Sequence, residues 1–138
     1  MAIKVIIAGA KGRMGRETVK MALDEPEFQL VAAIDSKLND VDLGETLGLG
    51  KLGILFHQDL EETILRYKPD VLIDFTTPQV VKQHILTALK HKVRPVVGTT
   101  GLSAEDLEEI GQVCNEQKVG AIIAPNFAIG AILMMKFA

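Results

Sequence analysis

The chain has 138 residues, a length typical of a single domain with one hydrophobic core. Its formal net charge of −3 and isoelectric point near 5.6 give no electrostatic reason to expect nucleic acid or an anionic membrane as a partner. Cys114 is the only cysteine, which excludes a disulfide framework within the chain and favours a reducing, cytoplasmic compartment. No apolar run reaches the roughly 18 residues that a membrane-spanning helix needs.

Short apolar runs rich in β-branched residues alternate with longer segments of helical periodicity. The apolar runs predict strands at residues 3–8, 30–34, 71–73, 95–97 and 121–124. Helices between parallel strands cover both faces of a sheet. The sequence therefore predicts an α/β fold, a Rossmann-like doubly wound parallel sheet with helices on both faces.

The segments between these runs carry helix signals. After the first run, Met14, Thr18, Met21 and Ala22 recur at helical spacing, and the pattern ends before Pro26. A second helix is expected over residues 79–91. A third is expected to begin at Ser103, where Asp106 three residues later completes a capping box, and to run through Lys118.

Two further stretches are interpreted as surface. Residues 43–53, "LGETLGLGKLG", hold four glycines without the spacing of a P-loop, and they predict a mobile surface loop. His84 and His91 lie seven residues apart on one face of the expected helix. Because Lys90 and Lys92 flank His91, this face is expected to be solvated and not to bind a ligand.

Three glycines follow the first predicted strand at intervals of three residues. In a Rossmann unit such glycines permit the tight turn, the approach of backbone to a pyrophosphate and the close packing of helix on strand, roles that suit Gly9, Gly12 and Gly15. The anion would lie at the helix N-terminus. Asp35 ends the second strand 20 residues beyond Gly15, where a carboxylate binds an adenosine ribose. Together these features predict a dinucleotide site.

Three later segments follow predicted strands, at the edge where open α/β sheets bind ligands. They are "DFTTP" at 74–78, "VVGTTGLS" at 96–103 and "APNFAIG" at 124–130. The second supplies backbone amides and two hydroxyls that suit a cofactor amide or a substrate carboxylate. Ordinary loops that precede helices would have a similar composition, so the residues alone leave both interpretations open.

In this order and spacing, the motifs "GAKGRMG", "AAID", "DFTTP", "GTTG" and "APNF" resemble the N-terminal domain of the dihydrodipicolinate reductase family. Enzymes of this family act in the diaminopimelate route to lysine. The resemblance extends along the whole chain. It implies a nicotinamide cofactor, NADH or NADPH, and a small dicarboxylate substrate.

The resemblance also implies the residues of the site. The pyrophosphate would lie on Gly9, Ala10, Lys11, Gly12, Arg13 and Met14. Asp35 would bind the adenosine ribose. The nicotinamide side would be lined by Gly98, Thr99, Thr100, Ala124, Pro125, Asn126 and Phe127, with Phe75 and Thr76 beside it. Thr100 would also lie near the substrate carboxylate.

Asp35 and Lys37 bear on the choice between the two cofactors. A carboxylate on both ribose hydroxyls favours NADH and repels the 2′-phosphate of NADPH. Many family members carry a basic residue directly after the acid. Here Ser36 stands in that place, and Lys37 is one step further along. We therefore expect both cofactors to be used, with NADH modestly preferred.

Family members continue into a substrate domain that carries a paired-histidine motif, a catalytic lysine and a Pro-Ser-Gly-Thr loop. The sequence ends in an apolar stretch, residues 130–138, without these motifs. We interpret residues 1–128 as the dinucleotide-binding domain and 129–138 as the start of the connection to that second domain. No catalytic residue or metal ligand is assigned to this chain.

The chain is accordingly expected to bind cofactor without catalysis, and the full-length reductase to be a homo-oligomer, a tetramer as the family implies. Two alternatives stay open at this point. One is a stand-alone nucleotide-sensing Rossmann module, which would use the same glycines and Asp35. The other is a different small amino-acid dehydrogenase on the same fold.

Overall fold

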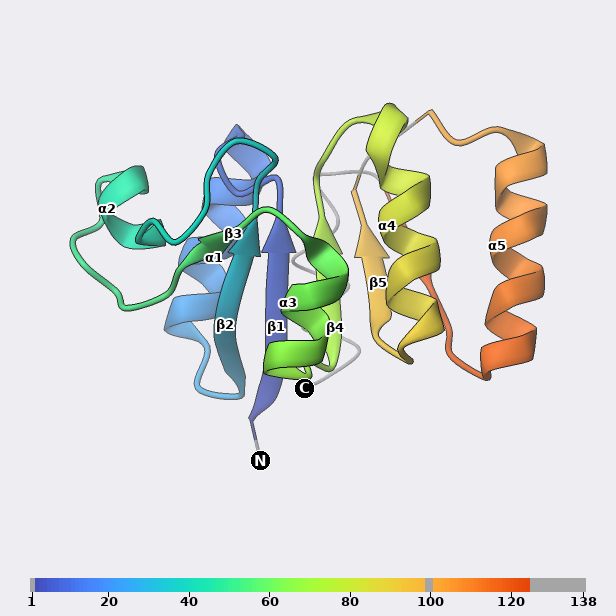
Figure 1. Ribbon diagram of the computed structural model, residues 1–138, viewed down its shortest axis with the longest axis horizontal. Helices are drawn as coiled ribbons and strands as arrows, with labels where there is room; N and C mark the ends of the chain where they lie inside the picture. Colours follow the sequence, from blue (N-terminus) through green and yellow to red (C-terminus); the bar gives the residue numbers. More distant parts are fainter. Residues whose placement is uncertain (1, 99–100, 125–138) are drawn as a thin grey trace.

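The computed structural model of the protein describes residues 2–98 and 101–124. Strands and helices alternate along the chain, and Figure 1 shows them with the sheet running through the middle of the molecule. The elements are β1 (Ile3–Ala8), α1 (Arg13–Asp24), β2 (Phe28–Ile34), α2 (Leu43–Leu47), β3 (Phe56–His57), α3 (Leu60–Tyr67), β4 (Val71–Asp74), α4 (Pro78–Lys90), β5 (Arg94–Val97), α5 (Ala104–Gln117) and β6 (Ile122–Ile123).

Within the described residues, the strands form one six-stranded parallel sheet in the order β3-β2-β1-β4-β5-β6. The chain builds outward from β1 to β3, then returns to the other side of β1 and builds outward from β4 to β6. The order therefore reverses between β1 and β4, which is where open α/β sheets bind their ligands. The fold class expected from the sequence is confirmed.

The side chains of β1 alternate between the two faces of the sheet. Val5 and Ile7 join a cluster that includes Val19 of α1, whereas Ile6 packs on the opposite face with Ile64 of α3. All five side chains are buried. Figure 1 shows α1 behind the sheet and α3 and α4 in front of it, so helices cover both faces.

The expected strands and helices are present with small shifts in their ends. β1 has the expected bounds, while β2 begins two residues earlier than expected, at Phe28. α5 begins after Ser103, which forms the expected capping box with Asp106, and Lys118 caps its end. The pattern-based analysis gave no separate assignment to β3 and α3, which are short.

The expectation of a mobile surface loop over residues 43–53 is wrong. The segment contains α2, and Leu43 and Leu47 pack into the main core. Asp42 organises it, because its carboxylate accepts hydrogen bonds from the backbone N–H groups of Glu45, Leu52 and Gly53 at 2.9, 3.1 and 2.8 Å.

These bonds act on the carboxylate itself. The N–H of Glu45 first, then those of Leu52 and Gly53, hold the pKa of Asp42 below its ordinary value against the opposing effect of burial. A carboxylate with a lowered pKa in the folded state stabilises the fold above its unfolded pKa, and this contribution is lost as the pH falls. The ionised Asp42 side chain therefore holds the two ends of the glycine-rich segment, residues 43–53, together.

Gly15 and Gly111 offer a matched test of the packing of α1. A Cβ atom at Gly15 would overlap the carbonyl oxygen of Gly9, whereas one at Gly111, in α5, meets no described heavy atom within 4 Å. We expect Gly15→Ala to lower the free energy of unfolding by about 2–3 kcal/mol, because the backbone of α1 or of the turn at Gly9 must shift to make room for the methyl group. Gly111→Ala should raise it by about 0.5–1 kcal/mol through helix propensity. Urea unfolding of both variants measures this, and a neutral Gly15→Ala would contradict the packing described here.

Candidate functional site

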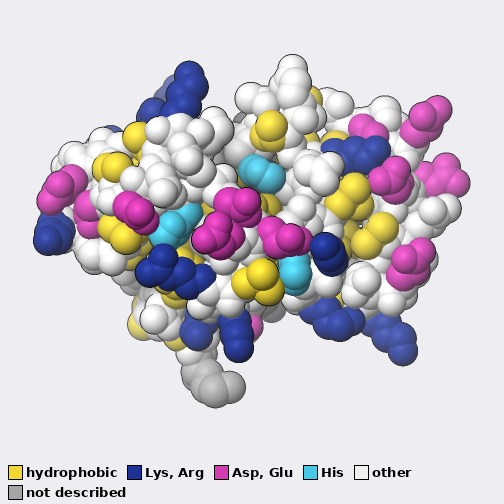
Figure 2. Space-filling view, in the orientation of Figure 1, with side chains coloured by type: hydrophobic (Ala, Val, Ile, Leu, Met, Phe, Trp, Pro, Cys, Tyr) yellow, Lys and Arg dark blue, Asp and Glu magenta, His cyan; other side chains and the backbone are white. Residues whose placement is uncertain are grey.

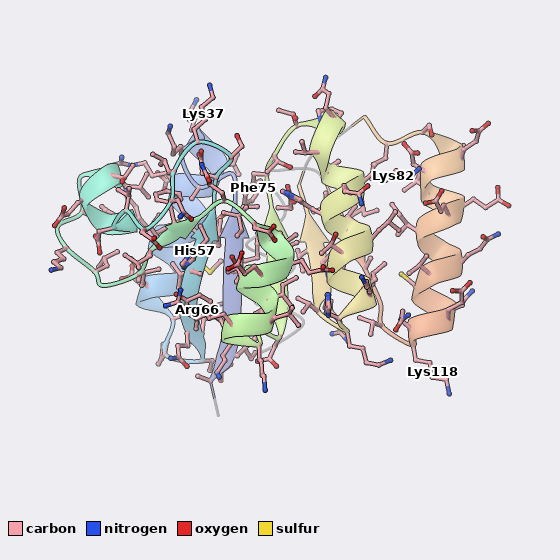
Figure 3. All side chains as sticks on the ribbon, viewed as in Figure 1. Lys37, His57, Arg66, Phe75, Lys82 and Lys118 are labelled. Atoms are coloured by element: carbon pink, nitrogen blue, oxygen red, sulfur yellow. The ribbon has the colours of Figure 1, made fainter. Side chains whose placement is uncertain are left out.

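A pocket of about 350 Å³ opens at the carboxyl ends of β1, β2 and β4. Six of the residues predicted from the sequence line it: Gly9, Lys11, Gly12, Asp35, Phe75 and Thr76. They come from three loops that are far apart in the sequence. The pocket therefore lies at the reversal of strand order, and Figure 3 shows Phe75 there.

The loop after β1 is shaped by close backbone contacts. Gly9 has φ +82°, and a Cβ atom there would lie 2.8 Å from the carbonyl carbon of Phe75. Gly15 lies directly against Gly9 across the turn. Ala10 has no exposed surface and packs in the core beneath the loop, so its side chain supports the turn from below.

Helix α1 begins without a side-chain cap in the described part of the chain. Its N-cap is Gly12, and its first turn holds no acidic residue. By contrast, α2, α3 and α5 begin at Asp42, Asp59 and Ser103, whose side chains accept bonds from their first turns. The first N–H groups of α1 therefore remain available to an anion.

Gly12 also leaves space above this helix end. A Cβ atom there would lie 3.6 Å from the carbonyl oxygen of Gly9, an ordinary van der Waals contact, so the fold itself does not require glycine here. Lys11 and Arg13 beside it are exposed, and Met14 is half-buried. Glycine at this position suits a ligand that must approach the backbone closely.

Asp35 is half-buried where β2 ends. Its Oδ1 accepts a hydrogen bond from the backbone N–H of Lys37 at 2.8 Å, and its own N–H donates to the carbonyl of His57 at 3.1 Å. The Oδ2 atom has no hydrogen-bond partner among residues 2–98 and 101–124. The backbone therefore fixes the carboxylate while one oxygen stays available for a hydroxyl.

Lys37 is exposed, and no ion pair holds its ammonium group in the described part of the chain. In Figure 3 its side chain extends away from the body of the molecule near the end of β2. A flexible ammonium in this place can reach a phosphate bound beside Asp35.

The sequence interpretation missed a buried hydrogen bond beside the pocket, between Asp74 and His84. Asp74, the last residue of β4, has no exposed surface. Its Oδ1 accepts bonds from the N–H and the hydroxyl of Thr76, at 2.7 and 2.5 Å, and its Oδ2 lies 2.7 Å from Nδ1 of His84. His84 also lines the pocket.

The expectation of a solvated face is therefore wrong at His84, whose partner Asp74 is fully buried. His84 continues the buried stripe of Val81, Ile85 and Ala88 on α4, a spacing that could have revealed its inward position. His91 bonds through Nε2 to Glu61 at 2.9 Å, and this bond lowers the pKa of the Glu61 carboxyl. Figure 2 shows histidine side chains next to acidic ones on this face.

The residues expected on the nicotinamide side are partly described. Gly98 is buried and donates its N–H to the carbonyl of Asp74 at 3.0 Å, and Ala124 donates to Val97 at 2.9 Å. Both follow strand ends at the same edge as the pocket. The other expected residues lie outside the described part of the chain: Thr99, Thr100, Pro125, Asn126 and Phe127.

The geometry fits a dinucleotide. An uncapped helix end faces the phosphate position, and an available carboxylate oxygen stands at the end of the neighbouring strand, as ribose hydroxyls require. Among the described residues, His, Cys, Asp and Glu form no group of three that could hold a metal ion. In the same part of the chain, no helix is long and apolar enough to cross a membrane.

Comparison with known proteins decides the family. Residues 3–127 match the family described as dihydrodipicolinate reductase, N-terminus. The chain belongs to the dihydrodipicolinate reductase family. Membership of this reductase family implies a nicotinamide dinucleotide cofactor, in agreement with the pocket.

Relatives in this family are closely similar. The 4-hydroxy-tetrahydrodipicolinate reductase of Bacillus velezensis is 53% identical over 135 residues, which are 98% of this chain and 50% of the relative. That of Geobacillus kaustophilus is 47% identical over 138 residues, which are 100% of this chain and 52% of the relative. The chain thus spans about half the length of these curated relatives.

A solved structure shares the fold. Dihydrodipicolinate reductase from Paenisporosarcina sp. TG-14, described as dipicolinate-bound, has a TM-score of 0.80 and 41% sequence identity. The match covers 99% of this chain and 52% of that chain. Nearly the whole of the present chain therefore corresponds to about half of that reductase.

Proposed function

We propose that this chain is the NAD(P)H-binding half of a 4-hydroxy-tetrahydrodipicolinate reductase, an enzyme of the diaminopimelate route to lysine. The observation that carries the proposal is the pocket at the strand reversal, where the uncapped start of α1 and the available oxygen of Asp35 stand side by side. The names of the related proteins supply the reaction. In this proposal the protein works in the cytoplasm.

The pyrophosphate binds over the glycine loop. The N–H groups at the start of α1 donate to its oxygens, and the positive end of the helix dipole favours its charge. Lys11 and Arg13 are exposed beside the loop and add positive charge. Gly12 allows the phosphates to approach the backbone, because it places no Cβ atom in their way.

The adenosine ribose binds at Asp35. Its Oδ2 accepts hydrogen bonds from the ribose hydroxyls, while the N–H of Lys37 keeps Oδ1 in place. The carboxylate opposes a 2′-phosphate, and the Lys37 ammonium attracts one. Both NADH and NADPH are therefore used, with NADH modestly preferred.

The nicotinamide lies toward the ends of β4, β5 and β6. The residues assigned to it are Phe75, Thr76, Gly98, Thr99, Thr100, Ala124, Pro125, Asn126 and Phe127. When bound, the dihydronicotinamide supplies the hydride. The chain orients this ring, and Thr100 binds a carboxylate of the dicarboxylate substrate, a ligand class that the dipicolinate-bound relative supports.

Residues 1–128 form the dinucleotide-binding domain, and 129–138 begin the connection to the substrate domain. The groups that bind the rest of the substrate and supply a proton belong to that second domain, because no residue of this chain is assigned to either task. The full-length enzyme is a homo-oligomer, a tetramer as its family implies. The coverage of about half of each relative supports this division.

Gly12→Ala tests the phosphate position. The new methyl group fits the protein, with its nearest contact at 3.6 Å, but it projects toward the phosphates. We expect NADH and NADPH to bind at least about tenfold more weakly. The variant should stay folded, with a slightly lower unfolding midpoint, because Gly12 is the N-cap of α1 and alanine is a poorer N-cap than glycine. Calorimetric titration measures the affinities, and thermal unfolding measures the midpoint. Gly111→Ala, a glycine replacement away from the pocket, is the control for binding. Unchanged affinity in a folded variant would place the pyrophosphate elsewhere.

Asp35 and Lys37 test the ribose position. Asp35→Ala should weaken NADH binding by about tenfold and NADPH binding less, because the 2′-phosphate no longer meets a like charge. Lys37→Ala should weaken NADPH by about threefold and leave NADH nearly unchanged. Titrations of each variant at one ionic strength give the comparison. Equal losses for both cofactors on removal of Lys37 would show that the ribose lies elsewhere.

A reductase assay tests whether this chain binds the cofactor without catalysing the reaction. The longer protein that includes the second half should oxidise NADH when the tetrahydrodipicolinate precursor is added, and the 138-residue chain should bind NADH without oxidising it. The fall in the absorbance of the dihydronicotinamide measures the oxidation of NADH by each of the two proteins. Substrate-dependent turnover by the short chain would overturn its role as a cofactor-binding half. Binding without turnover in the longer protein would favour a nucleotide-sensing module.

A further inference from the structure

A second cavity, of about 250 Å³, lies between β3 and α3. Its lining comes from the loop after β2, from the end of β3 and from one face of α3. Among the described residues it shares only Gln58 with the dinucleotide pocket. The contacts assigned above to phosphate, ribose and nicotinamide do not use this cavity.

His57, the last residue of β3, presents one edge of its ring to this cavity. The residue is only 8% exposed, and its Nε2 forms a 2.9 Å hydrogen bond with the hydroxyl of Tyr67. Its Nδ1 lies 3.8 Å from Oδ1 of Asp40 and has no hydrogen-bond partner among residues 2–98 and 101–124. No fully buried side-chain nitrogen in these residues lacks a partner, so Nδ1 is reached from the cavity.

Charged side chains of both signs line the cavity without pairing to each other. Glu62 and Arg66 lie four residues apart on α3, a spacing that allows an ion pair on a helix, yet the two form none. Arg66 instead lies over the ring of Tyr67, with its Cζ 5.2 Å from the ring centroid. Figure 3 shows Arg66 and His57 on the same side of the molecule. These charges are therefore available to a ligand.

The same charges act on the His57 ring. Burial first, and then the Arg66 guanidinium, lower the pKa of the His57 imidazole below its ordinary value. Asp40 and Glu62 act in the opposite direction. The ring is therefore neutral near pH 7, where Nδ1 can donate or accept one hydrogen bond. Charges from the loop after β2 and from α3 thus converge on one buried ring.

The charges restrict what this cavity can bind. A simple anion is opposed by the carboxylates of Asp40, Asp59 and Glu62. A metal ion is not supported, because His, Cys, Asp and Glu of the described residues form no group of three that could hold one. Three carboxylates and one guanidinium favour a ligand with more ammonium groups than carboxylates. The volume of about 250 Å³ suits a molecule of the size of an amino acid.

We propose that this cavity binds a free basic amino acid, which carries two ammonium groups and one carboxylate. The Arg66 guanidinium pairs with the carboxylate, because its fork of N–H groups matches the two oxygens. Asp40 and Glu62 accept hydrogen bonds from the ammonium groups, and Nδ1 of His57 bonds to the α-amino acid end. The inference goes beyond the proposed function and does not depend on it.

The test titrates the 138-residue chain with L-lysine and two analogues. L-Norleucine lacks the side-chain ammonium group of L-lysine, and cadaverine lacks its carboxylate. We expect L-lysine to bind saturably with a Kd of about 1 mM, and each analogue to bind at least about fivefold more weakly, because one charged pairing is lost. Calorimetric titration at neutral pH and one low ionic strength gives the three affinities.

Arg66→Gln isolates the contact with the carboxylate. It should weaken the binding of L-lysine by about fivefold. Cadaverine should bind at least as tightly as before, because it has no carboxylate and no longer meets a like charge. The preference for L-lysine over cadaverine should therefore disappear, whereas a purely structural role of Arg66 would weaken both ligands.

Glu62→Gln and Glu61→Gln form a matched pair in the first turn of α3. Glu62 lines the cavity, whereas Glu61 accepts hydrogen bonds from Lys90 and pairs with His91 on α4. Each change removes one negative charge from the same helical turn, so their effects on the helix dipole are alike. We expect Glu62→Gln to weaken L-lysine binding by about threefold and Glu61→Gln to leave it unchanged.

NMR of the histidine rings locates the ligand. L-Lysine should shift the ring resonances of His57 and leave those of His84, in the dinucleotide pocket, unchanged. The inference is wrong if the folded chain is not saturated by about 20 mM L-lysine, or if L-norleucine binds as tightly. It is also wrong if the His57 ring does not shift, if Arg66→Gln keeps the preference over cadaverine, or if the two glutamate variants behave alike. The proposed function is judged separately, by titration with NADH.

Discussion

The contact of Gly15 with the carbonyl oxygen of Gly9 sets the position of α1 on the sheet. No side chain fits between the helix and the turn after β1, so the helix starts directly above the strand end. Its first N–H groups then face the reversal of strand order between β1 and β4. Every proposed contact with phosphate depends on this close approach, because a helix held farther away would not aim its donors into the pocket.

The helices differ in whether a side chain caps their N-terminus, and this difference marks the helix that is proposed to bind the ligand. Helices α2, α3 and α5 begin at residues whose side chains bond to their own first turns. In the described part of the chain, α1 and α4 lack such side-chain caps, and the residues at both starts, Gly12 and Thr77, line the same pocket. Within the described residues, the first N–H groups of α1 are thus left without partners where a negatively charged ligand is proposed to bind. At α4, Pro78 has no N–H and Val80 donates its N–H to the carbonyl of Thr77.

The sequence predicted the fold class, the glycine loop and Asp35 because their signals are local: strand periodicity, glycine spacing and an acid at a strand end. The closure of residues 43–53 was missed, since it depends on bonds from Asp42 to Leu52 and Gly53. The pairing of His84 with Asp74 was missed for a similar reason. Ten residues separate the two, and only the packing of α4 on the sheet brings them together.

The most direct measurement is an amide NMR titration of the 138-residue chain with NADH. The account predicts that shifts concentrate at the glycine loop, at Asp35 and at the start of α4, because these groups face one pocket. The amides of α5, on the far side of α4, should stay unchanged. Saturable shifts that leave the glycine loop unaffected and gather around Asp40 and Arg66, which line a different cavity, would contradict the account.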